Sequence, residues 1–218
     1  TIRSKAKAQG RHKRQTGGKG QFGDCWLELE PLERGAGFVF ENKVVGGSIP
    51  KNFIPAVEKG VRETMEHGFL AGYAVVDVKA TVYDGSYHDV DSSEMAFKIA
   101  GSLAFKAAAE QATPIILEPV MALEVDVPDE CVGDVVGDLN GRRGHLQGME
   151  PTSPGKTTVR AQVPMATMMR YALDLRSITK GRGRFRQTLD HYGELPHPEV
   201  QKLAAEYQKQ RQAHEAEH

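Results

Sequence analysis

The stretch Gly85-Ser86-Tyr87-His88-Asp89-Val90-Asp91-Ser92-Ser93-Glu94 separates a valine-rich segment from an alanine-rich one and organises the first half of the chain. Residues 74–83, which precede it, have the composition of a β-strand. Asp91 stands three residues before Glu94, an arrangement close to a capping box, so a helix is predicted over residues 93–112. The stretch is therefore predicted to be a polar loop that joins a strand to a helix N-terminus and carries one isolated histidine.

The segment at the start of the chain alternates as a strand with one basic face. Within residues 1–15 one parity carries the cations Arg3, Lys5, Lys7, Arg11 and Lys13, and the other begins with the small or apolar side chains Ile2, Ser4, Ala6 and Ala8. The glycine-rich run 16–23 interrupts this strand. Further strands and one helix are predicted over residues 25–32, 38–42 and 50–66. Since residues 1–23 contain no Asp or Glu, this end fits either an anionic partner or a solvated strand surface.

The second half has a simple order of predicted elements. Strands are expected over residues 120–127, 144–149, 157–163 and 183–189, and helices over 128–139 and 165–177. This β-α-β-β-α-β order is that of a ferredoxin-like domain. The chain is therefore predicted to be α+β, with domains over residues 1–117 and 118–192. A tail over 193–218, rich in Gln, Lys, Glu and Ala, is expected to be an exposed, fraying helix.

The composition narrows the class of protein. The 218 residues carry a formal net charge of −1, so the chain is not a general polycation. Cys25 and Cys131 are far apart, which argues against a disulfide framework and a zinc site. No apolar run approaches the roughly 20 residues that a membrane span needs, and the polar, basic start is unlike a signal peptide. A cytoplasmic protein with reduced thiols is expected, and Thr1 suggests a start inside a longer gene product.

Long ordered motifs of this chain resemble bacterial elongation factor G, the translocase of the ribosome. The resemblance is carried by residues 85–94 and by Thr16-Gly17-Gly18-Lys19-Gly20-Gln21-Phe22-Gly23, Gly46-Gly47-Ser48-Ile49-Pro50, Leu70-Ala71-Gly72-Tyr73, Gly137-Asp138-Leu139-Asn140-Gly141-Arg142-Arg143-Gly144 and Leu175-Arg176-Ser177-Ile178-Thr179-Lys180-Gly181-Arg182-Gly183. It extends to about Tyr192 and covers domains IV and V of that factor. It implies an N-terminal mixed-sheet α/β sandwich with a ribosomal-protein-like βαβ unit, followed by a ferredoxin-like domain.

The resemblance also implies sites and partners. Two tip loops, near residues 16–23 and 85–92, would contact the decoding region through Gly18, Lys19, Gln21, Phe22, Tyr87, His88 and Asp89. The second domain would contact ribosomal RNA through Arg142, Arg143, His145, Lys180, Arg182 and Arg184. The implied partner is the ribosome, with its rRNA and the tRNA–mRNA of the A site, and neither DNA nor a membrane. A monomer without cofactor, metal or catalytic residue is expected, because the GTP and Mg²⁺ of the parent belong to a missing N-terminal domain.

Each motif also has a plainer interpretation. Without the resemblance, the glycine-rich loop would be taken for a strand connector, and His88 for a surface or hydrogen-bonded structural residue. Lys180, Arg182, Arg184 and Arg186 alternate towards the last predicted strand, with Phe185 between them, and could equally be solvated edge charges. The run Pro154-Gly155-Lys156-Thr157 is not a phosphate-binding loop, because Glu150 stands where the first glycine is required.

The parent's role within the family stays open at this point. The stretch 32–38 is shorter than in many members, and the tail after Tyr192 has a composition of its own. These departures favour a paralogous member, so a specialised recycling or protection factor is an alternative to the main translocase. A stand-alone ribosome- or RNA-binding protein is a further alternative, because both domain patterns could bind RNA unaided.

Overall fold

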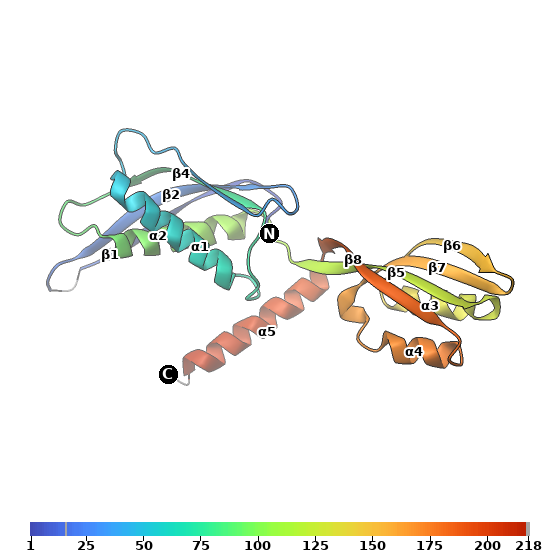
Figure 1. Cartoon of the computed structure of the whole chain (residues 1–218). Coiled ribbons are helices and arrows are strands. Elements are labelled where there is room, and N and C mark those ends of the chain that lie inside the picture. The colour runs from blue at the N-terminus through green and yellow to red at the C-terminus, as the bar shows by residue number, and fades with distance from the viewer. Residues whose placement is uncertain (16, 217–218) are drawn as a thin grey trace. The chain divides into compact units, whose positions relative to one another are not determined.

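The computed structural model describes residues 1–15 and 17–216 and divides the chain into two compact units (Figure 1). Unit 1 comprises Thr1–Ile116 and Pro196–His218, and unit 2 comprises Leu117–Leu195. Thr16, which begins the predicted loop 16–23, and the last two residues of the predicted tail lie outside the described residues. The predicted α+β fold with two separate sheets is confirmed.

Unit 1 is a four-stranded sheet covered on one face by two helices (Figure 1). The sheet order is β1-β2-β4-β3, with β3 parallel to β4 and the other pairs antiparallel. The elements are β1 (Ala6–Arg14), β2 (Gln21–Pro31), β3 (Phe38–Asn42), the 3-10 turn η1 (Lys51–Phe53), α1 (Ile54–His67), β4 (Val78–Ser86) and α2 (Glu94–Gln111).

Glycine and alanine bring α2 close to the sheet and to α1. A Cβ on Gly10 of β1 would lie 2.0 Å from the carbonyl oxygen of Ala100, and a Cβ on Gly60 of α1 would lie 2.0 Å from that of Lys98. Because real Cβ atoms do not approach other atoms so closely, both contacts require glycine. Glycines of β1 and α1 thus allow close packing against the alanine-rich helix α2. The apolar core lies between the two helices and one face of the sheet.

Unit 2 has the ferredoxin-like β-α-β-β-α-β order that the sequence predicts. Its elements are β5 (Leu117–Pro128), η2 (Asp129–Cys131), α3 (Val132–Gly141), β6 (His145–Ser153), β7 (Lys156–Pro164), η3 (Met165–Thr167), α4 (Tyr171–Ile178) and β8 (Arg184–Glu194). The strands are antiparallel in the order β6-β7-β5-β8. The helices α3 and α4 cover one face (Figure 1), and the core beneath them contains Leu123, Val125, Val159, Val163 and Tyr171.

Two predicted elements begin later than expected, for identifiable reasons. The strand predicted from residue 74 starts at Val78, because Asp77 has a positive φ of 60° and Val75 donates instead to the carbonyl of Met65 at the end of α1. The helix predicted from residue 165 starts as the turn η3, and α4 proper begins at Tyr171. The carbonyl of Thr167 accepts from a guanidinium instead of continuing a helical ladder.

The tail is a helix, α5 (His197–Ala216), and it groups with unit 1. Its inner face includes Leu203, Ala204 and Tyr207, which are half-buried. A Cβ on Gly72, which has a positive φ of 76°, would lie 2.6 Å from the Tyr207 ring. None of the helices in the described residues is long and apolar enough to cross a membrane.

Candidate nucleic-acid interface

Two loops from distant parts of the sequence are joined at one end of unit 1, and Asp91 joins them. Its carboxylate accepts a hydrogen bond from the backbone N–H of Gly20 at 3.1 Å, and its carbonyl accepts one from that of Phe22 at 2.8 Å. A Cβ on Gly20 would lie 2.8 Å from the Asp91 carboxyl carbon, so the first loop needs glycine there. We call residues 17–22 and 87–92 together the paired tip loops.

The second tip loop is also tied to itself, through His88. The imidazole Nδ1 accepts hydrogen bonds from the backbone N–H groups of Val90 at 3.3 Å and Asp91 at 3.2 Å. The backbone N–H of His88 in turn donates to the hydroxyl of Ser92 at 2.9 Å. Because Nδ1 acts as an acceptor, the neutral ring carries its proton on Nε2. The side chain is 57% exposed, so the loop presents a single oriented N–H donor to a partner.

The helix that follows is capped by Ser93, which corrects the capping box expected from Asp91. The Ser93 hydroxyl accepts from the backbone N–H of Ala96 at 3.1 Å, and α2 begins at the next residue, Glu94. The Asp91 carboxylate is thereby free to bind the first loop. The local pattern predicted where the helix starts, but the partner of Asp91 lies in a distant segment, since Asp91 and Gly20 differ by 71 positions.

The first tip loop offers exposed polar groups of a different kind. Gln21 Oε1 lies 2.8 Å from His12 Nε2, which holds the amide of the side chain in place. Gly18 and Lys19 are exposed, and Gly17 has a positive φ of 47°. The Phe22 and His88 rings are tilted neighbours with centroids 6.5 Å apart, while Tyr87 and Asp89 are exposed in the same loop as His88. The predicted tip residues are thus brought together on one small surface.

The exposed groups of this surface offer hydrogen-bond donors and acceptors. Within residues 1–15 and 17–216, no group of three His, Cys, Asp or Glu side chains is arranged to hold a metal ion. The Cys25 thiol lies in the core, where burial raises its pKa to about 12, so it is neither a nucleophile nor a metal ligand at neutral pH. The donors and acceptors of the tip can form hydrogen bonds with the polar groups of a partner whose shape fits the tip.

Two of the arginines that the sequence suggests as RNA contacts are bonded to other residues of unit 2. The Arg142 guanidinium is 13% exposed, donates to Asp138 at 2.8 Å, to Asp174 at 2.5 Å and to the carbonyl of Thr167 at 2.5 Å, and lies 5.1 Å from the centre of the Tyr171 ring. It therefore links α3 to α4. Arg143 forms a two-pronged pair with Glu118, with N–O distances of 2.7 and 2.9 Å, and is 37% exposed.

The remaining predicted RNA contacts lie on the two edge strands of the sheet and in the turn before β8. His145 is exposed at the start of β6, one edge, and Arg184 is exposed at the start of β8, the other edge. Lys180 and Arg182 lie in the turn before β8, where Arg182 pairs with Glu130. Phe185 faces the helices and packs edge-on against Tyr171, so it is not part of an exposed surface.

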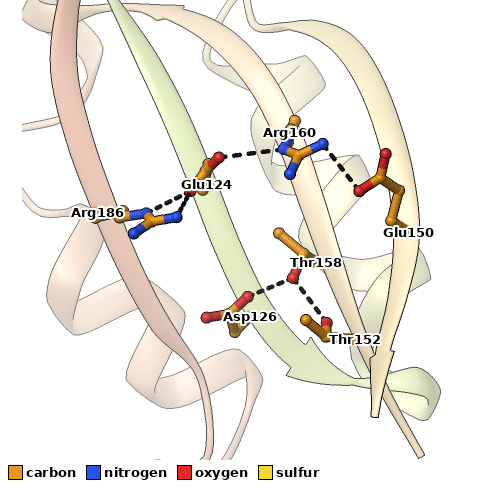
Figure 2. Close-up of polar contacts among 7 residues, drawn as sticks. All are labelled: Glu124, Asp126, Glu150, Thr152, Thr158, Arg160 and Arg186. Atoms are coloured by element: carbon orange, nitrogen blue, oxygen red, sulfur yellow. Dashed lines mark hydrogen bonds and ion pairs between the residues drawn. The ribbon is translucent and has the colours of Figure 1, made fainter.

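The open face of the unit 2 sheet carries a charged row that sequence inspection missed. Figure 2 shows Arg186, Glu124, Arg160 and Glu150 bonded in turn across all four strands. The pKa of the Glu124 carboxyl is lowered, chiefly because Arg186 donates a hydrogen bond to it and because Arg160 donates a second. Beside this row, Thr158 bonds Asp126 and Thr152 (Figure 2). Alternation along each strand identified a polar face, but only the strand order could reveal that its charges cancel.

Each of the two units, the first with its paired tip loops and the second with its ferredoxin-like sheet, matches a model of the same family of translation factors. Residues 1–113 match elongation factor G, domain IV, and residues 115–203 match the elongation factor G C-terminus. The chain belongs to the elongation factor G family.

A solved structure is similar to this chain over nearly its whole length. A crystal structure of a protein from Thermus thermophilus is 44% identical in sequence and superposes with a TM-score of 0.77 over 95% of this chain. The present chain spans 31% of the length of that protein. The resemblance to domains IV and V is thus confirmed.

Proposed function

We propose that this chain is the ribosome-contacting part of an elongation factor G-like protein that promotes the movement of tRNA and mRNA. In this proposal the paired tip loops enter the A site of the small subunit, while unit 2 contacts rRNA of the large subunit. The parent's GTP and Mg²⁺ would be bound outside this chain, which would itself act without a cofactor, in the cytoplasm.

The observation that carries the proposal is the joining of two distant loops into one tip by Asp91. Four hydrogen bonds hold the His88 ring and backbone, and two more hold the first loop to the second. A tip held in this way loses little conformational entropy when it binds, so its contacts can discriminate between states of the ribosome. A factor biases only those states that it binds unequally, and an oriented donor at the tip is suited to such discrimination.

Within unit 2, exposure separates the proposed RNA contacts by role. His145, Lys180 and Arg184 are exposed and are the side chains we propose as direct contacts. Arg143 and Arg182 could reach RNA only by sharing or leaving their carboxylate partners. Arg142 would act indirectly, by holding α3 and α4 in place.

The proposal is tested by replacing His88 with alanine in the complete factor. Translocation measured by stopped-flow fluorescence should slow, while ribosome-stimulated GTP hydrolysis stays close to that of the wild type. His67→Ala is the matched control, because His67 is an exposed histidine of unit 1 outside the tip loops. Equal translocation rates for the His88 variant and the wild type would contradict a role for the tip in movement.

A further inference from the structure

The basic face of β1 consists of two halves with different electrostatic surroundings. In the half remote from the tip loops, Lys5 is paired with Glu30 and Lys7 with Glu28. Lysine–glutamate pairs continue across the sheet, where Lys79 on β4 pairs with Glu41 on β3 at 2.7 Å. These lysines are matched by carboxylates on neighbouring strands, so this half of the face attracts a polyanion only weakly.

In the half next to the tip loops the cations have no such partners. Arg11 and Lys13 are exposed and form no ion pair within the described part of the chain. The carboxylate opposite Arg11 belongs to Asp24, which is only 6% exposed and accepts hydrogen bonds from Gln9 at 2.8 Å and Ser86 at 2.6 Å. Asp84, the exposed carboxylate on this face, accepts from the backbone of Gly85.

Aromatic rings contact two of the cations of this face, Arg11 and Lys7. The Arg11 guanidinium lies 5.5 Å from the centre of the Phe22 ring, and the Lys7 ammonium lies 5.0 Å from that of Tyr83. Such contacts limit the side-chain motion that binding would otherwise have to freeze. Since Phe22 also neighbours His88, the positioned guanidinium lies directly beside the tip loops.

We propose that Arg11 and Lys13, on the open face of β1 next to the tip, bind the phosphate backbone of an RNA. The inference rests on the proposed function, because it concerns the RNA that flanks the tip once the tip is in place. Two cations that form no ion pair among the described residues, on the open face of an edge strand, complement a phosphodiester chain. The guanidinium fork of arginine can also donate two hydrogen bonds to one phosphate. The open face of unit 2 differs in this respect, since Arg160 and Arg186 are both neutralised by glutamates (Figure 2).

The test is the salt dependence of binding of the full 218-residue chain to protein-free ribosomal RNA. The double variant Arg11→Gln/Lys13→Gln should bind about tenfold more weakly at low salt, and the slope of log K against log salt should fall by about 1.5. Lys5→Gln/Lys7→Gln is the matched control, with the same change of charge on the same strand, and should change the slope by less than about 0.5. Arg11→Lys with native Lys13 should keep the slope, which separates charge from packing against Phe22.

The outcomes separate the two proposals. If the wild-type chain binds RNA and the Arg11/Lys13 variant keeps its slope, this inference is wrong while the proposed function stands. Equal losses in both double variants would overturn it too, because they would show a general effect of charge. Failure of the wild-type chain to bind RNA at any salt would overturn it together with the RNA contacts of the proposed function. The spectrum of Trp26, the one tryptophan of the chain, verifies that each variant is folded.

Discussion

Replacement of Arg142 with alanine should destabilise unit 2, because the guanidinium is held inside the fold. It is 13% exposed, and its partners Asp138 and Asp174 are 24% and 43% exposed. Removing one partner of a fully buried pair costs about 3–5 kcal/mol, but these aspartates can be partly rehydrated, which reduces the cost. Adding the lost bond to the Thr167 carbonyl and the contact with the Tyr171 ring, we expect a loss of about 2–3 kcal/mol.

For a domain of this size such a loss lowers the midpoint of thermal unfolding by about 10 °C or more. The assay follows far-ultraviolet circular dichroism together with tryptophan fluorescence, since Trp26 lies in unit 1 and does not report on unit 2. The dichroism transition of unit 2 should move to lower temperature while the Trp26 transition stays in place. Arg184→Ala is the control, because Arg184 is exposed and should change stability by no more than about 0.5 kcal/mol.

The same pair of variants separates structure from RNA contact. If Arg142→Ala left the unit 2 transition unchanged and weakened ribosome binding, the guanidinium would be an RNA ligand and the reasoning from its carboxylate partners would be refuted. If Arg184→Ala weakened ribosome binding without a change in stability, the assignment of direct contact to the exposed side chains would be supported.

Three further changes test the packing, the charged row and the tip. Gly60→Ala should destabilise unit 1 by about 1–3 kcal/mol in Trp26 fluorescence unfolding, because its Cβ would lie 2.0 Å from a carbonyl oxygen. Gly137→Ala in unit 2, whose Cβ would meet nothing within 4 Å, should leave the dichroism transition of unit 2 unchanged or raise its midpoint. The pKa of Glu124 is lower in the folded protein than its value of about 4.3 in the unfolded chain. Its contribution to stability is therefore complete above about pH 4.3 and is lost as the pH falls through the pKa of the folded state. Glu124→Gln should make the free energy of unfolding depend less on pH in this acid range. Asp91→Ala should release the loops, measured as faster hydrogen exchange of the Gly20 amide, and unchanged exchange would argue against the clamp.

Much of the fold follows from local sequence patterns. Alternation over β1 predicted one basic face, and the burial along the strand agrees, since Ala8 and Gly10 are buried while Lys7, Arg11 and Lys13 are exposed. The order of strands and helices in the second half was sufficient to predict a ferredoxin-like unit. These inferences succeed because a strand repeats every two residues and a helix every 3.6, so neighbours in the sequence suffice to reveal them.

The sequence predicted which residues lie in the candidate site but not the hydrogen bonds and ion pairs that they form. His88 and the glycine-rich loop were identified as tip elements, yet the pattern assigned Asp91 to a helix cap that Ser93 provides. Likewise, the run containing Arg142 and Arg143 was taken for an RNA surface, whereas the structure engages both with carboxylates of their own unit.

The sequence by itself determined the periodicity of each element, the order of elements and the family motifs, because each of these depends on residues that are close together along the chain. Only the tertiary structure decided which charges are neutralised and which remain available. Glu124, one of the two glutamates bonded to Arg160, lies 36 residues away from it, and Gly20, which donates to Asp91, lies 71 residues away from Asp91. Coulombic and hydrogen-bond energies depend on separation in space, which strand order and packing determine. Among the described residues, lysine therefore forms an ion pair at position 7 and none at position 13.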